Sequence, residues 1–189
     1  MTAEDIVLSV AAALERAGIP YMAVGALAGV YYGINRTTDD ADFVIQVDEL
    51  NLSTLRQALG AEFIVDPQVG FESITLGTHY VVSHPDTDFN IDLFLLRHDA
   101  HEQSSFSRRR RIAFDRGETL ICTPEDLIIT KLKWASTGLR AKDLDDARAV
   151  LAVQQAKLDL PYIRHWCAHQ GTRELLEKTL QSLPPLPHD

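Results

Sequence analysis

The sequence has few of the features that mark disulfide-rich or membrane proteins. Its two cysteines, Cys122 and Cys167, form neither a disulfide framework nor a metal-binding spacing, and we expect both to be small buried apolar residues. No run of about 18 apolar residues is present, so no membrane-spanning helix is expected. Met1 begins no signal-peptide pattern. These absences predict a soluble protein of the cytoplasm.

Basic residues are also fewer than acidic residues. Lysine and arginine together number 18 against 27 aspartates and glutamates, so the formal net charge is −9. Surfaces that bind nucleic acid are usually basic, and this balance argues against a large nucleic-acid footprint. The run Arg108–Arg111 is the exception, because it could form a local patch for RNA. Such a run is more often a solvated or acid-pairing surface.

The first part of the chain alternates helical and strand patterns. The whole chain has 189 residues and 46% hydrophobic content, so it can bury the core of one domain, with or without a small appendage. We expect a polar loop or short helix between Arg97 and Ile112. Candidate strands, recognised by apolar content and flanking turn residues, are residues 21–24, 40–47, 61–65, 73–76, 80–83, 89–96, 112–115 and 119–122.

The pattern changes after Cys122. Thr123 is a good N-cap, Pro124 suits the first helical position, and acidic residues fill the first turn. From there the sequence is helical almost to its end. We therefore predict an α/β (α+β) core with a mixed β-sheet flanked by helices over residues 1–122, and a helical C-terminal part over residues 123–189.

Two aspartates open the apolar run that ends at Val47. Side chains alternate between the faces of a strand, so Asp40 and Asp42 are expected on one face and Asp39 on the other. Neighbouring carboxylates repel each other, and a cation between them relieves the repulsion. Mg²⁺ is the natural candidate, because it takes oxygen ligands from one or two carboxylates and substrate phosphates. The alternative is a solvated acidic turn, which is the commoner origin of an isolated Asp-x-Asp.

A glycine upstream makes the cation more plausible. Gly25 lies between the short strand that begins at Tyr21 and a helical segment. At such a turn the first backbone N–H groups of the helix are unpaired, and the missing Cβ allows a phosphate to approach. A phosphate cradle followed by a carboxylate pair is a coherent device for binding a nucleoside triphosphate.

These features resemble the polymerase-β-like nucleotidyltransferases, whose signature is a Gly-Ser or Gly-Gly turn, a helix, and an Asp-x-Asp on the next strand. The spacing Arg36-x-Thr38-x-Asp40-x-Asp42 looks most like the minimal and AbiEii-type toxin nucleotidyltransferases, and it also resembles small antibiotic-modifying nucleotidyltransferases. Ala26 departs from the family pattern, since it stands where the family has Ser or Gly. This departure removes one phosphate contact and leaves the backbone amides.

Asp92 is the single charge in the apolar run from Phe89 to Leu96. A lone carboxylate there must be paired, exposed at an edge or bound to a ligand, because burying it free is costly. An edge strand with Asp92 in water satisfies the pattern equally well. The resemblance implies that Asp92 is the third family carboxylate, which holds the metal at the attacking hydroxyl and assists its deprotonation.

Lys131 lies beside the apolar stripe of the first C-terminal helix. On spacing alone, such a lysine is usually a surface residue whose stem covers apolar groups. The fragment that continues to Lys142, Asp143 and Asp146 is similar to the helical segment of the toxin-like nucleotidyltransferases. The resemblance implies that Lys131 contacts the triphosphate or orders the site.

The resemblance thus implies attack by a hydroxyl on the α-phosphorus of a nucleoside triphosphate, with release of pyrophosphate. It assigns two Mg²⁺ ions and catalysis to Asp40, Asp42 and Asp92, and nucleotide binding to Gly25, Ala26, Arg36, Thr38 and Lys131. The acceptor stays open among RNA such as tRNA, a protein and a small hydroxylated molecule such as an antibiotic. Toxin relatives add the expectation of an antitoxin partner. A catalytically idle nucleotide-binding module is a further alternative, for which Ala26 is the hint.

Overall fold

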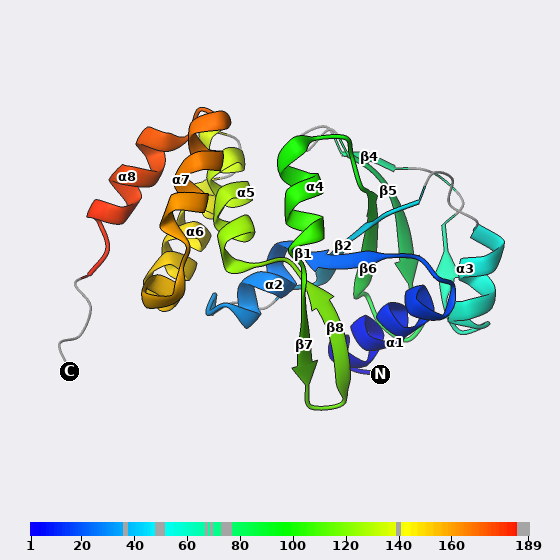
Figure 1. Cartoon of the computed structure of the whole chain (residues 1–189). Helices are drawn as coiled ribbons and strands as arrows, with labels where there is room; N and C mark the ends of the chain where they lie inside the picture. The colour runs from blue at the N-terminus through cyan, green and yellow to red at the C-terminus, as the bar shows by residue number, and fades with distance from the viewer. Residues whose placement is uncertain are drawn as a thin grey trace. The chain divides into compact units, whose positions relative to one another are not determined.

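The structure is a computed structural model that describes residues 1–35, 38–47, 52–66, 68, 70–72, 77–138 and 141–184. It divides into two compact units, shown in Figure 1. The first unit comprises Met1–Leu27 and Thr37–Cys122, and the second comprises Ala28–Arg36 and Thr123–Asp189. The second unit therefore contains a short N-terminal segment in addition to the C-terminal helices.

The first unit is built on a mixed sheet. Its described strands follow the order β3-β5-β6-β2-β1-β8-β7, and β4 pairs with β5. The pairs β1–β8 and β2–β6 are parallel, and the other pairs are antiparallel. The bounds are β1 Tyr21–Val24, β2 Asp40–Ile45, β3 Ile64–Val65, β4 Gly70–Glu72, β5 Gly77–Ser83, β6 Asn90–Leu95, β7 Arg110–Phe114 and β8 Gly117–Ile121. The predicted α/β class with a mixed sheet is confirmed.

Helices cover both faces of this sheet. On one face, the Tyr21 hydroxyl donates to Glu15 of α1 (Ala3–Arg16) at 3.1 Å. On the other face, the hydroxyl of Ser105 in α4 (Ala100–Ser107) lies 3.9 Å from the Met22 sulfur. The helix α3 (Leu52–Leu59) lies beside α1, where a guanidinium nitrogen of Arg16 donates to a carbonyl of α3 at 2.7 Å (Figure 1). The core of the first unit is therefore split into two layers by the sheet.

Several strand predictions need correction. The strand β4 was not expected, because its three residues are too few to form an apolar pattern. The predicted strand at residues 73–76 lies outside the described residues. The loop or short helix expected between Arg97 and Ile112 contains α4, so the short helix is confirmed. The arginine run that follows is not a loop, since Arg108 caps α4 and Arg110 begins β7, two residues before the expected strand. The hairpin expected around residues 116–117 is confirmed by the pairing of β7 with β8.

The second unit is helical in its described part. It contains α5 (Pro124–Ser136), α6 (Ala141–Gln154), the 3₁₀ turn η1 (Gln155–Lys157), α7 (Leu160–His169), α8 (Arg173–Gln181) and the end of α2 (Gly25–Tyr31). The Thr123 hydroxyl accepts from the Asp126 backbone N–H at 3.2 Å, so the predicted start of α5 is confirmed. Cys122 and Cys167 are free and buried, as expected. Across the described residues, no helix has the length and apolar character that crossing a membrane requires.

Candidate active site

The structure brings the three predicted catalytic aspartates onto one face of the sheet. Because β2 and β6 are parallel and in register, Asp42 lies level with Asp92, and Asp40 lies level with Asn90. The intervening Ala41 of β2 is fully buried, whereas Asp40 is exposed and Asp42 and Asp92 are half-buried. Neighbouring strands are about 4.8 Å apart, so the Asp42 and Asp92 backbones are immediate neighbours. We call the face that carries these three side chains the carboxylate face.

The carboxylate face is the face that α4 covers. Met22 alternates with Tyr21 along β1, and Ser105 of α4 contacts Met22. Through the pairing of β1 with β2, Met22 lies level with Val44, which shares its face with Asp42. The helix α1 is on the opposite side. The sheet therefore separates α1 from the predicted catalytic aspartates.

Gly25 is directly linked to Asp42. It follows Val24, which pairs with Asp42, and it has a left-handed φ of +60°. A Cβ atom added to Gly25 would lie 2.0 Å from Asp42 Oδ2, which is far inside contact distance. Glycine is thus required twice, since its backbone conformation disfavours other residues and its missing side chain makes room for the carboxylate. The sequence indicated the turn but not the contact with Asp42.

Thr38 contacts the other aspartate of the pair. Its hydroxyl lies 2.8 Å from Asp40 Oδ1 and 3.0 Å from the Asp40 backbone oxygen. A hydroxyl has one proton, and an ionised carboxylate is the stronger acceptor. The proton of Thr38 is therefore donated to the Asp40 side chain.

The structure says less about Ala26 and Arg36, the remaining residues predicted to contact the nucleotide. Ala26 is the second residue of α2 and is half-buried within the first unit. Arg36 lies outside the described residues. Their predicted contacts with a nucleotide stay predictions.

Lys131 belongs to the second unit and is 1% exposed. Its ammonium lies 2.6 Å from Asp143 Oδ1 and 2.8 Å from Asp146 Oδ2, and these hydrogen-bonded ion pairs join α5 to α6. The centroid of the Trp134 ring lies 5.8 Å from the ammonium. The sequence marked all three charged residues as one motif, but nothing in their spacing indicated that the lysine pairs with the two aspartates. This placement supports a role in holding the helices together, and a direct triphosphate contact stays a prediction.

The donor set on the carboxylate face fits Mg²⁺ carried by a nucleotide. Among the described residues, no three His, Cys, Asp or Glu side chains are gathered closely enough to form a metal centre on their own. Mg²⁺ seldom needs such a cage, because it binds through one or two carboxylates, substrate phosphates and water. Asp42 and Asp92, level on adjacent strands, and Asp40 beside them supply the oxygen donors of this kind of site.

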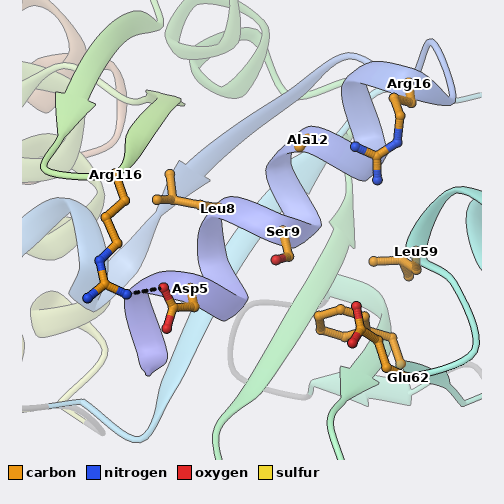
Figure 2. A pocket seen from close by; sticks show the side chains of 9 residues that line it. Asp5, Leu8, Ser9, Ala12, Arg16, Leu59, Glu62 and Arg116 are labelled. Carbon is orange, nitrogen blue, oxygen red and sulfur yellow. Dashed lines mark hydrogen bonds and ion pairs between the residues drawn. The ribbon is translucent and has the colours of Figure 1, made fainter. Parts of the chain in front are cut away.

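A pocket of about 360 Å³ lies along α1, away from the carboxylate face. Figure 2 shows Asp5 and Ser9 on α1, with Leu59 and Glu62 across from them. Its Asp5 and Arg116 side chains form an ion pair at 2.7 Å, drawn as the dashed line in Figure 2. The lining residues are Asp5, Leu8, Ser9, Ala12, Arg16, Leu59, Glu62, Phe63 and Arg116, so its acidic and basic groups are equal in number. None of the predicted catalytic or nucleotide-binding residues lines it.

Comparison with solved structures identifies the class of fold. The chain resembles an antigenic nucleotidyltransferase-like protein from Paracoccidioides brasiliensis at 17% identity, over 94% of this chain and 92% of that chain, with a TM-score of 0.54. It resembles the antibiotic-resistance factor ANT(2'')-Ia in complex with adenylyl-2''-tobramycin at 12% identity, over 92% and 99% of the two chains, with a TM-score of 0.58. The solution structure of that factor gives 12% identity, coverage of 96% and 98%, and a TM-score of 0.56.

These similarities show that the chain has the fold of nucleotidyltransferase-like proteins. No family model and no curated protein matches the sequence. The predicted fold is therefore confirmed, and membership of the superfamily stays a prediction. The expected closeness to AbiEii-type toxins is not tested by these comparisons and stays a prediction.

Proposed function

We propose that this chain is a Mg²⁺-dependent nucleotidyltransferase that moves a nucleoside monophosphate group from a nucleoside triphosphate to a hydroxyl of an acceptor. The observation that carries the proposal is the register of β2 and β6, which sets Asp42 level with Asp92 and keeps Asp40 on the same face. Three carboxylates in this arrangement, within a nucleotidyltransferase fold, support nucleotidyl transfer better than a purely structural role.

In the proposed reaction, the acceptor hydroxyl oxygen bonds to the α-phosphorus. The bond from the α-phosphorus to the bridging oxygen breaks, and pyrophosphate leaves with those electrons. Asp92 accepts the hydroxyl proton. Two Mg²⁺ ions held by Asp40, Asp42 and Asp92 would neutralise charge on the phosphate oxygens and favour ionisation of the hydroxyl.

The nucleotide contacts follow the family resemblance. Backbone N–H groups at Gly25 and Ala26 would approach the β- and γ-phosphates, and Arg36 would neutralise further charge. The Lys131 ammonium is held by two carboxylates. Lys131 would therefore act indirectly, by keeping the helices of the second unit in place. The idle-module alternative rests on Ala26, and the three aligned aspartates argue against it.

A small hydroxylated and cationic acceptor is our preferred substrate class. Exposed Asp86 and Asp88 lie in the loop that leads into β6. Because β2 and β6 are parallel, these acidic residues lie at the same end of their strands as Asp40. ANT(2'')-Ia was solved with adenylyl-2''-tobramycin, an adenylylated small molecule, and this supports the same class of acceptor.

At least two of the four arginines are already engaged within the first unit. The Arg109 guanidinium lies 4.3 Å from the Phe106 ring centroid and donates to the Phe106 carbonyl at 2.5 Å. Arg111 pairs with Glu15 at 3.1 Å. This leaves a smaller basic patch than the sequence suggested. A tRNA acceptor and an antitoxin partner remain predictions of the family resemblance without support from these contacts.

Label transfer tests the proposal. Purified protein, Mg²⁺ and each α-labelled nucleoside triphosphate are incubated with cell extract, which is then separated into RNA, protein and small-molecule fractions. We expect label in the small-molecule fraction, absent with Asp42→Asn. Label in the RNA fraction would refute the acceptor class and retain the chemistry. Absence of both label and Mg²⁺-dependent triphosphate binding would refute the function.

A further inference from the structure

The two aspartates of the Asp-x-Asp pair are held by different means. Asp42 Oδ2 occupies the space where a side chain of Gly25 would begin, so the backbone of the turn confines this carboxylate. Asp40 has no such confinement, because it is exposed at the first position of β2. Its carboxylate is oriented instead by the Thr38 hydroxyl, 2.8 Å from Oδ1.

The Thr38 hydrogen bond is the decisive contact for Asp40. Within the described part of the chain, no other residue hydrogen-bonds or ion-pairs with the Asp40 carboxylate. An exposed aspartate otherwise moves between staggered χ1 rotamers. A charge-assisted hydrogen bond to one oxygen selects one rotamer, and it leaves the second oxygen available to a ligand.

We propose that Thr38 is a positioning residue that sets the Asp40 carboxylate for cation binding, rather than a nucleotide contact. Its single proton is given to Asp40, so it has none to donate to a phosphate oxygen at the same time. Mg²⁺ requires near-octahedral geometry, and a carboxylate that is already oriented binds it with less loss of freedom. This inference rests on the proposed metal-dependent function and names the residue that prepares the site.

The test compares Thr38→Val, which keeps the shape of the side chain and removes the hydroxyl, with Thr38→Ser, which keeps the hydroxyl. The probe is Mn²⁺ together with each α,β-methylene nucleoside triphosphate, followed by electron paramagnetic resonance. We expect Thr38→Val to bind Mn²⁺ roughly 10-fold more weakly, as is typical when a partner of a metal ligand is lost. Thr38→Ser should bind it as the wild type does, and both variants should keep the wild-type melting temperature.

A second readout needs no metal. The Hα–Hβ couplings of Asp40, measured by NMR in the metal-free protein, should report one χ1 rotamer in the wild type and in Thr38→Ser. In Thr38→Val they should average over several rotamers. Averaged couplings in all three proteins would overturn the inference, because the hydrogen bond would then not orient Asp40.

The outcomes separate this inference from the function on which it rests. If the wild type binds Mn²⁺ and Thr38→Val binds it equally well, the inference fails and the function stands. If Thr38→Ser binds as weakly as Thr38→Val, the hydroxyl is not the cause and the inference also fails. If the wild type binds no Mn²⁺ with any of the nucleotides, the metal-dependent function fails and the inference fails with it.

Discussion

The two units each contain a cluster of carboxylates, and the clusters differ in burial. In the first unit, Asp40 is exposed and Asp42 and Asp92 are half-buried on the carboxylate face. In the second unit, Asp143 is 0% exposed and Asp146 is 6% exposed, and the Lys131 ammonium lies within 2.8 Å of both.

Burial explains why only one cluster suits a ligand. A buried charge must keep its partner, because an unpaired charge in a low-dielectric interior is very costly. A hydrated carboxylate can exchange water for a metal ion without disturbing the core. Changes on the carboxylate face should therefore alter activity with little effect on stability, and changes around Lys131 should do the reverse.

The largest effect is expected for Asp42→Asn and Asp40→Asn. Each should lower nucleotidyl transfer by at least about 100-fold, because a preorganised charge at the reacting phosphate is lost. The melting temperature should change little, since both side chains keep contact with solvent. The measurement is transfer of label from an α-labelled nucleoside triphosphate, with unfolding followed by circular dichroism.

Asp39→Asn is the matched control for this pair. Asp39 is exposed and precedes β2, and strand alternation puts its side chain on the other face from Asp40. The variant should keep most of the activity. Equal damage from Asp39→Asn and Asp40→Asn would show that the assigned face is wrong, and activity in both site variants would exclude the assigned chemistry.

In the second unit, Lys131→Ala should destabilise the fold by about 3–5 kcal/mol, because it leaves two buried carboxylates without their cation. Urea unfolding measures this loss. Lys178→Ala removes an exposed lysine that is 2.7 Å from Glu174, and it should lower the unfolding free energy far less, because water screens an exposed ion pair. Wild-type stability of Lys131→Ala together with lost triphosphate binding would reverse the interpretation and support the predicted nucleotide contact.

Gly25→Ala tests the link between the turn and Asp42. The added Cβ would displace the Asp42 carboxylate, so we expect a loss of transfer activity in addition to backbone strain of about 1 kcal/mol. Gly18→Ala is a close control, since Gly18 has φ +68° and nothing within 4 Å of an added Cβ. It should show the strain without the loss of activity. Equal activity in the two variants would mean that the Asp42 carboxylate tolerates the displacement.

Features encoded by adjacent residues could be predicted from the sequence. The start of α5 depends on Thr123 and the residues just after it, and these act within one helical turn. The shared face of Asp40 and Asp42 follows from strand alternation alone. In each case the residues concerned are so close in sequence that the local backbone conformation fixes their relative positions.

Features that join distant residues could not be predicted in this way. The register that sets Asp42 level with Asp92 depends on pairing between strands far apart in the sequence, and alternation within one strand carries no information about it. The contacts of Lys131 with Asp143 and Asp146 require α5 and α6 to pack together. In both cases the family resemblance singled out the residues, but only the tertiary structure shows which residues lie next to them.

The smallest expected effect concerns Asp5, a third kind of carboxylate, which is half-buried and serves a helix start. The Thr2 backbone N–H donates to Asp5 Oδ2 at 2.9 Å, and Arg116 pairs with Oδ1 at 2.7 Å. The Thr2 backbone hydrogen bond first, then the Thr2 side chain and Arg116, lower the pKa of Asp5 from 3.8 to about 2. A lowered pKa in the folded state means that this stabilisation is present above the unfolded value and is lost as the pH falls.

Asp5→Asn should therefore flatten the dependence of the unfolding free energy on pH between about 4 and 2. Thr2→Ser keeps the reciprocal hydrogen bonds with Asp5 and should retain the wild-type slope. Transfer activity at neutral pH should be unchanged in both, because the sheet separates α1 from the carboxylate face. An unchanged slope in Asp5→Asn would mean that the capping carboxylate adds no acid-sensitive stability. Two kinds of carboxylate would then remain to be compared, the buried ones around Lys131 and those proposed to bind a ligand.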